Sequence, residues 1–193
     1  MVKALDSNEV NQVISILPDT FDGMRNKAII LLFADTGMRL SELANLTLNH
    51  ISLETGRALI TGKGNQQRIV VFNSATKKSL WKYLTIREQI VKENAKDCLW
   101  ITEEGLRLTI AGLNIAFRRI KRRAGINGGG SVHKLRHTFA LNALRGLKDP
   151  TLLQLLLGHK SLEMTRRYTQ GLKIEEALKA LEKASPVDRL GLA

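Results

Sequence analysis

The chain has 193 residues, enough for one or two domains, and its 44% hydrophobic content can supply a buried core. Lysine and arginine outnumber aspartate and glutamate by 30 to 18, and the resulting net charge of +12 favours a polyanionic partner. The single cysteine, Cys98, excludes an intrachain disulfide and fits a reducing compartment. There is no apolar signal region, and the longest apolar run, residues 28–34, is too short to span a bilayer, so the sequence predicts a soluble cytoplasmic protein.

The beginning of the chain is predicted to be helical. A first helix, capped by Asp6 or Ser7, is expected to run to about residue 17. Pro18 ends this helix, because proline cannot continue a helical hydrogen-bond ladder. A second helix is expected over residues 21–35, where apolar residues recur with helical periodicity, and Gly37 is expected to break it.

A tight turn and a small sheet follow. Ser41 is expected to cap a short helix over residues 42–46, which places Arg39 in a turn between two helices. Residues 50–72 then contain three short stretches of strand-forming residues, separated by two turns that contain glycine. The second of these turns carries Lys63. This region predicts a three-stranded antiparallel sheet.

The remainder of the chain is predicted to be helical, with residues 125–130, which include three consecutive glycines, as a flexible linker. Asp149 followed by Pro150 is a good helix start. The fold class is therefore α+β and mainly helical, with one small three-stranded antiparallel sheet. The later helices are expected over residues 74–94, 109–124, 134–146, 150–157, 161–167 and 174–184.

Basic residues are concentrated in one part of the chain. No aspartate or glutamate occurs between Gly105 and Lys148, where about four would fall at random, while ten basic residues do. A solvated basic face would explain such a run, but we prefer a surface that faces phosphates. The residues predicted to bind DNA are Arg118, Arg119, Lys121, Arg122, Arg123 and Lys134.

Tyr168 is the candidate nucleophile for attack on a phosphate. A phenol has an ordinary pKa of ~10 and is mostly protonated at neutral pH, so its attack needs a base or strong electrostatic help. His133 can accept a proton near neutrality, and Lys63 on its turn can protonate a leaving alkoxide. These groups together need no metal ion.

Two arginines and a second histidine can hold the phosphate. Arg39 and Arg136 carry planar guanidinium groups that match the non-bridging oxygens and stabilise the charge of the transition state. His133 and Arg136 are three residues apart and share one helical face. His159, which follows the helix-ending Gly158, can donate a further hydrogen bond. Each residue alone could be a surface salt bridge or a core histidine, so the interpretation rests on their combination.

Four stretches of sequence resemble the tyrosine recombinase (phage integrase) family, and the resemblance covers about residues 5–183. The stretches are T-G-M-R-L-S-E-L-A-N-L, G-K-G-N-Q-Q-R-I-V-V, H-K-L-R-H-T-F-A and L-L-G-H-K-S-L-E-M-T-R-R-Y-T. Glu42 resembles the acidic residue that often supports the first arginine of the family, although an acid in the first turn of a helix, favoured by the helix macrodipole, would also stand there. The resemblance implies that Arg39 and Arg136 are the two phosphate-clamping arginines and that Tyr168 is the nucleophile. It also implies that His133 is the general base and Lys63 the general acid. His159 is implied to be a further hydrogen-bond donor.

The reaction implied by the resemblance is a transesterification of DNA. Tyr168 would attack a phosphodiester, form a 3′-phosphotyrosyl link and free a 5′-hydroxyl, and a 5′-hydroxyl of a partner strand would reverse the step. Because the bond energy is kept in the covalent link, no metal, ATP or other cofactor is expected. The implied partners are double-stranded DNA and further copies of the chain, as a tetramer on DNA, and no membrane.

The resemblance also implies a domain organisation. Residues 1–185 are expected to form the catalytic domain and residues 186–193 a flexible tail. The N-terminal helical domain with which family members complete a clamp around DNA is expected to be absent. The helix predicted over residues 174–184 would either dock on a neighbouring protomer or pack on its own domain.

Three other functions compete with recombination. A type IB topoisomerase-like activity uses the same chemistry but rejoins the original strand. A non-catalytic DNA-binding module would keep the basic helices and make no use of Tyr168. A basic protein on an anionic membrane would need an amphipathic helix with aromatic residues opposite lysines, which a chain with 5% aromatic residues does not display.

Overall fold

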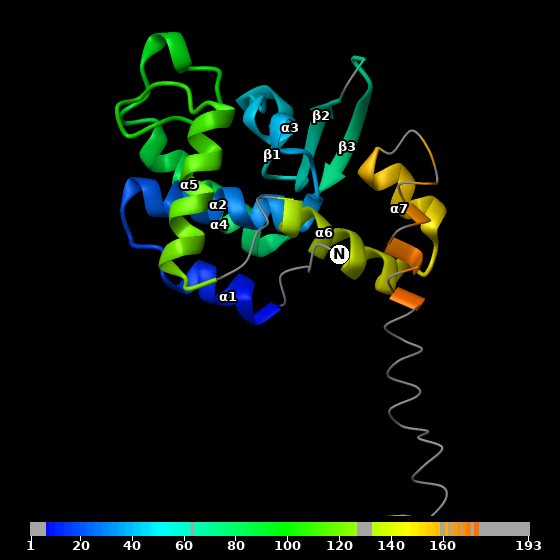
Figure 1. Cartoon of the computed structure of the whole chain (residues 1–193). Helices are drawn as coiled ribbons and strands as arrows, with labels where there is room; N and C mark the ends of the chain where they lie inside the picture. Colours follow the sequence, from blue (N-terminus) through cyan, green and yellow to red (C-terminus); the bar gives the residue numbers. More distant parts are fainter. Residues whose placement is uncertain are drawn as a thin grey trace, which may run out of the picture. The chain divides into compact units, whose positions relative to one another are not determined.

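The computed structural model describes residues 7–62, 64–126, 133–158, 161, 163, 165–166, 168–170 and 172–173. The chain divides into two compact units, Met1–Phe139 and Ala140–Ala193, and the helix α6 begins in the first and continues into the second. The predicted fold class is confirmed: the chain is mostly helical and has one small three-stranded antiparallel sheet (Figure 1). Among the residues described, no helix is both long enough and apolar enough to cross a membrane.

The first unit contains the sheet and most of the helices. Its elements, in chain order, are α1 (Ser7–Ser15), α2 (Phe21–Thr36), α3 (Leu40–Ala44), a 3₁₀ turn (Leu48–His50), β1 (Ile51–Ser52), β2 (Arg57–Thr61), β3 (Gln67–Val71), α4 (Ser74–Arg87), a second 3₁₀ turn (Glu93–Ala95), α5 (Ile110–Arg123) and the start of α6 (His133–Leu147).

The sheet has the strand order β1-β2-β3, and both pairings are antiparallel. Ala58 pairs with Val70, and both are buried on the face that packs on the core. On β3 the alternate residues Ile69 and Val71 point outward and are 59% and 60% exposed. This alternation follows from the two-residue period of a strand, and it puts Arg68 on the same face as Val70.

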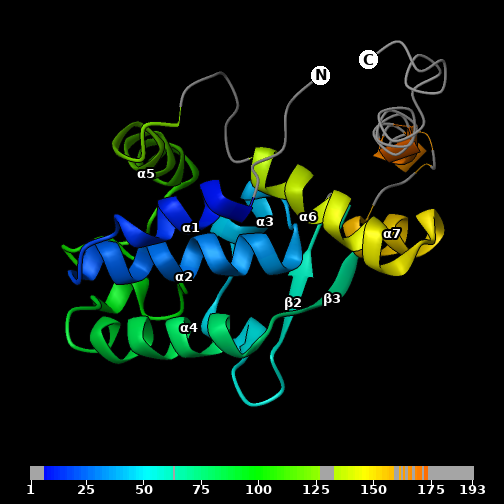
Figure 2. The same cartoon turned by 90° about the horizontal axis from the view of Figure 1, so that it is seen from below.

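Helix α2 forms the centre of the hydrophobic core. The side chains of Ala28, Ile29, Leu32 and Phe33 are almost completely buried, as their helical spacing predicts. Figure 2 shows α4 running along one side of α2. The left-handed Gly37 ends α2, because its amide donates to the carbonyl of Phe33 at 2.9 Å.

A second part of the core is organised around Tyr83 on α4. Its hydroxyl donates to the carbonyl of Leu99 and accepts from the amide of Ile101, both at 3.0 Å. Its ring stacks on that of Trp100, with the ring centroids 5.5 Å apart. Burial raises the pKa of Tyr83 to about 12, so this phenol stays neutral at any physiological pH.

Helix α4 is shorter than the helix predicted over residues 74–94, and it ends at Arg87. The guanidinium of Arg87 is buried and donates to the carbonyls of Ala95, Lys96 and Cys98 at 3.2, 2.6 and 2.6 Å. These bonds hold the returning chain against the end of α4. The predicted end of this helix was wrong, because the contacts that end it join Arg87 to carbonyls 8 to 11 residues later and leave no local signal.

Two other predicted boundaries were also wrong. Helix α3 begins at Leu40 and not at residue 42, and its N-cap is Arg39 in place of Ser41. The predicted helix over residues 161–167 stopped too early, because residues 168–170 are also helical. Tyr168 therefore belongs to a helical segment and does not follow one.

In the second unit, the predicted helix over residues 150–157 is confirmed as α7 (Pro150–Leu157). The side chain of Asp149 accepts a hydrogen bond from the amide of Thr151 at 2.7 Å, and Pro150 occupies the first turn. Gly158 adopts a left-handed conformation with φ of 61° and ends the helix, as the sequence predicted. The helix predicted over residues 174–184 lies outside the described residues.

Gly37→Ala is expected to destabilise the protein more than Gly125→Ala. Both glycines have a positive φ, 55° and 65°, which costs an alanine about 1–2 kcal/mol. A β-carbon on Gly37 would also lie 2.1 Å from the ring of Phe139, whereas a β-carbon on Gly125 would meet nothing within 4 Å. The overlap should add roughly 1–3 kcal/mol. Urea denaturation of both variants measures the difference, and equal losses would contradict the steric role of Gly37.

Candidate active site

The candidate site is built around the turn that joins α2 to α3. Gly37 ends α2 in a left-handed conformation, and the next residue, Met38, is fully buried. This anchor leaves Arg39, at the start of α3, with a side chain that is 37% exposed. The predicted position of Arg39 in a tight turn between helices is thus confirmed.

Glu42 fixes the conformation of Arg39. Its Oε2 accepts a hydrogen bond from the backbone amide of Arg39 at 2.6 Å, and its Oε1 accepts one from Nη1 of Arg39 at 2.9 Å. The first bond caps α3, and the second orients the guanidinium. Glu42 is therefore an ion-pair partner of Arg39, as the resemblance implied, and it also caps α3, which the sequence analysis did not predict.

Arg68, which lies in the second family stretch but was given no role in the sequence analysis, also binds Glu42. Nη1 and Nη2 of Arg68, on β3, donate to Oε1 and Oε2 of Glu42 at 2.9 Å each. The side chain of Glu42 is 2% exposed and that of Arg68 15%. Burial acts to raise the pKa of Glu42, but the hydrogen bonds and charge of Arg68 and the bonds from Arg39 outweigh it and hold the pKa below its ordinary value.

Arg136 connects α6 to the same turn. The side chain is buried, and its Nη1 donates to the carbonyl oxygen of Gly37, two residues before Arg39. Phe139, one helical turn later, lies against the α-carbon of Gly37. The first unit therefore brings together the two segments that carry the predicted phosphate-clamping arginines.

The turn between β2 and β3 begins beside Arg39 and Glu42. The amide of Gly62 donates to the carbonyl of Gln66 at 2.8 Å and closes the turn. A β-carbon on Gly62 would lie 3.3 Å from Oε1 of Glu42 and 3.8 Å from Nη1 of Arg39. The residue that follows Gly62 is the predicted general acid, Lys63, which lies outside the described residues.

The remaining predicted catalytic residues are described only in part. His133 is the first residue of α6, but its side chain is outside the described part of the chain, as is that of Lys134. His159 is not among the described residues either. Tyr168 is helical and partly exposed, and it belongs to the second unit. The roles of these residues stay predictions.

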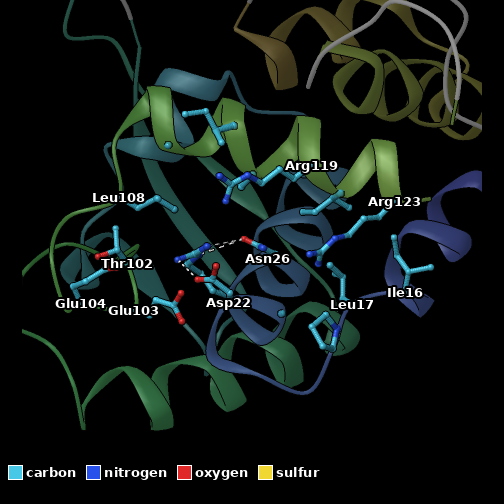
Figure 3. A pocket seen from close by; sticks show the side chains of 17 residues that line it. Ile16, Leu17, Asp22, Asn26, Thr102, Glu103, Glu104, Leu108, Arg119 and Arg123 are labelled. Carbon is cyan, nitrogen blue, oxygen red and sulfur yellow. Dashed lines mark hydrogen bonds and ion pairs between the residues drawn. The ribbon is translucent and has the colours of Figure 1, made fainter. Parts of the chain in front are cut away.

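Four of the five basic residues of α5 form two pairs of arginines, and the members of each pair are one helical turn apart. Arg119 and Arg123 reach from α5 into a cavity of about 330 Å³, whose far side carries Asp22, Glu103 and Glu104 (Figure 3). All four arginines are exposed, but Arg118 and Arg122 lie on a different stripe of the helix from the pair that lines the cavity. The predicted basic surface is therefore not a single stripe, since one pair faces carboxylates.

Comparison with known proteins identifies the family. The family described as the phage integrase family matches residues 3–174. The chain belongs to the phage integrase family. Its recognition from the sequence motifs is confirmed.

Individual members of the phage integrase family are similar over most of this chain. The tyrosine recombinase XerC of Lactobacillus leichmannii is 39% identical over 165 residues, which make up 84% of this chain and 56% of that protein. The crystal structure of XerA recombinase has a TM-score of 0.80 and 29% identity, and the match covers 96% of this chain and 66% of that one. XerH site-specific recombinase, bound to a palindromic difH substrate in a post-cleavage complex, has a TM-score of 0.79 and 31% identity over 93% of this chain and 53% of its own. The chain thus spans little more than half the length of the XerC protein that it matches.

Two further observations concern His137, which lies in the third family stretch, and the capacity of the chain to hold a metal ion. Burial lowers the pKa of His137, which favours the neutral imidazole. Among the residues described, no three histidine, cysteine, aspartate or glutamate side chains are grouped so that they could hold a metal ion.

The contribution of Glu42 to stability should depend on pH. Its folded-state pKa lies below the ordinary 4.5, so the stabilisation is fully present above pH 4.5 and is lost as the pH falls through the folded-state pKa. The gap in the free energy of unfolding between wild type and Glu42→Gln should therefore widen as the pH rises through this window and stay level above it. Urea denaturation between about pH 3 and 7 tests this. A gap that does not change with pH would show that the carboxylate charge contributes nothing.

Proposed function

We propose that this chain carries the catalytic domain of a site-specific tyrosine recombinase, with residues 1–185 as that domain. The observation that carries the proposal is the convergence of three segments that are far apart in the chain. The stretch that holds Gly37, Arg39 and Glu42 is bound by Arg136 of α6 and lies beside the turn that begins at Gly62. The names of the relatives, XerC and XerH among them, support site-specific recombination as the outcome of that chemistry.

The proposed reaction conserves the number of phosphoester bonds. The oxygen of Tyr168 forms a bond to a DNA phosphorus, and the bond from phosphorus to the 5′-oxygen breaks. The phenol proton passes to His133, and Lys63 donates a proton to the leaving 5′-oxygen, as the family resemblance implies. Arg39 and Arg136, with His159, bind the non-bridging oxygens and stabilise the added charge of the transition state. The reverse of these steps, with a 5′-hydroxyl of another strand, completes strand exchange.

The environments of the two tyrosines in the chain support Tyr168 as the nucleophile. Tyr83 is fully buried, and its hydroxyl is engaged by Leu99 and Ile101. A DNA phosphate could not reach that hydroxyl without unfolding the core. Tyr168 is partly exposed in a helical segment.

The partners proposed for this activity are double-stranded DNA and further copies of the chain, as a tetramer on DNA. The net charge of +12 favours a polyanion, and XerH is described on its difH DNA substrate. DNA in the bacteria that carry the XerC relatives lies in the cytoplasm, where we place the activity. The proposal requires no metal ion and no ATP, because the phosphotyrosyl link stores the energy of the broken bond.

Tyr168→Phe is expected to abolish covalent protein–DNA adducts while DNA affinity stays within about twofold, since only the attacking oxygen is removed. Wild type and variant would be incubated in EDTA, without ATP, with nicked duplexes that have a randomised core. SDS-resistant adducts would be counted and mapped by mass spectrometry.

Tyr83→Phe is the matched control, because it removes the only other phenolic hydroxyl of the chain. It should lower stability by about 1–3 kcal/mol, since buried backbone partners lose a hydrogen bond, and should still form adducts. Adducts that persist in Tyr168→Phe would rule out this nucleophile. Adducts that only reseal the original strand would favour a topoisomerase-like activity.

Arg118→Gln combined with Arg122→Gln should weaken the salt dependence of DNA binding. If both arginines contact phosphates, the slope of log K against log[salt] should become shallower by about 2. The matched double variant of Arg119 and Arg123 should change it less, because these side chains face three carboxylates across the cavity. Fluorescence anisotropy with a duplex at several salt concentrations measures both slopes. Equal changes in the two variants would contradict this division of α5.

A further inference from the structure

We propose that Arg68 is a positioning residue for the strand-cleavage reaction, which neutralises Glu42 and so leaves the positive charge of Arg39 available to the DNA phosphate. The inference rests on the proposed function, in which Arg39 binds that phosphate. It assigns Arg68 a role that goes beyond the six predicted catalytic residues and Glu42.

The geometry gives Glu42 a complete set of hydrogen-bond donors. Oε1 accepts from Nη1 of Arg39 and Nη1 of Arg68, each at 2.9 Å. Oε2 accepts from the Arg39 amide at 2.6 Å and from Nη2 of Arg68 at 2.9 Å. A carboxylate has about four lone-pair sites, and these four bonds occupy them. Arg68 supplies the two-pronged contact, the strongest geometry between a guanidinium and a carboxylate.

The balance of charge explains why a second arginine is useful at this position. Glu42 orients Arg39, but a carboxylate that cancels the charge of Arg39 would weaken the attraction of that guanidinium for a phosphate. With Arg68 present, the three side chains carry two positive charges and one negative charge, so the group keeps a net charge of +1. Without Arg68, the remaining pair of Arg39 and Glu42 would be neutral.

The exposure of the three side chains matches this division of roles. Glu42 is 2% exposed, Arg68 15% and Arg39 37%, so the solvent-facing member of the group is Arg39. Arg68 reaches Glu42 from β3, on the strand face that packs on the core. Its charge is therefore placed behind the carboxylate, where it compensates Glu42 while Arg39 stays accessible.

A purely structural role is the alternative, because Arg68 also attaches β3 to α3. The variants Arg68→Gln, Arg68→Lys, Glu42→Gln and the double variant Glu42→Gln/Arg68→Gln separate the two. Arg57→Gln is the matched control, since Arg57 is an exposed arginine on the neighbouring strand β2. The full chain would be used, and circular dichroism and thermal melting would establish that each variant is folded.

Two quantities would be measured on one nicked duplex, chosen from those recovered in wild-type adducts. The first is the single-turnover rate of adduct formation at saturating protein. The second is the dissociation constant for that duplex. Arg68→Gln should lower the rate at least about tenfold, the scale of losing one charge-stabilising group. Its effect on the dissociation constant should be smaller, within about threefold. Arg68→Lys keeps the charge but loses the two-pronged contact, so its rate should lie between those of Arg68→Gln and wild type.

The double variant decides between charge and structure. If Arg68 acts by neutralising Glu42, the double variant should form adducts faster than Arg68→Gln does. Where Arg68→Gln lowers the rate by more than about tenfold, the double variant should regain at least about tenfold in rate. Where the loss is smaller, the double variant should regain most of it. Any of three outcomes would overturn the proposal. In the first, the double variant is as slow as Arg68→Gln. In the second or third, Arg68→Gln is as fast as Arg57→Gln, or Arg68→Lys is as slow as Arg68→Gln. A wild-type chain that forms no adduct with any duplex would instead refute the proposed function, and this inference with it.

Discussion

The buried carboxylate of Glu42 is the constraint on which the geometry of the candidate site depends. It receives donors from the start of α3, from the side chain of Arg39 and from Arg68 on β3. Removing an ionised group of this kind from water is costly unless each of its oxygens is hydrogen-bonded and its charge is balanced. The fold meets both conditions by bringing a helix start and a strand to one point. The same point is where the turn at Gly62 begins, so a structural requirement and the proposed chemistry share one location.

Much of the fold was predictable because its signals are local. Gly37 and Gly158 end their helices in the left-handed conformation, and Asp149 caps the helix that Pro150 begins. Each of these features depends on residues within one helical turn of each other, so the sequence alone carries the information. Local signals of the same kind, a helix-breaking glycine followed by the start of a new helix, placed Arg39 in its turn.

The contacts that the sequence did not reveal join residues that are far apart in the chain. Arg68 reaches Glu42 across 26 residues, and nothing in the strand sequence indicated which of its faces is buried. Apolar residues occupy both faces of β3: Ile69 and Val71 point outward, and Val70 points inward. Alternation therefore could not assign Arg68 to the inner face. The end of α4 was missed for the same reason, because Arg87 binds carbonyls that lie 8 to 11 residues later.

The positive charge of the chain does not act as one surface. Arg87 and Arg25 are buried and bind backbone carbonyls, and Arg25 also pairs with Asp22 at 2.7 Å. Arg68 compensates a buried carboxylate, and Arg119 and Arg123 face acids across a cavity.

A guanidinium suits these positions because it donates in several directions while staying charged. The net charge of +12 therefore overstates the number of cations that can contact a phosphate. Of the two arginines that bind Glu42, Arg39 has the more exposed side chain and Arg68 the less exposed one. An arginine that is held by a carboxylate yet stays open to solvent, next to a second arginine that restores the charge, is the arrangement that binding one phosphate in a fixed orientation requires.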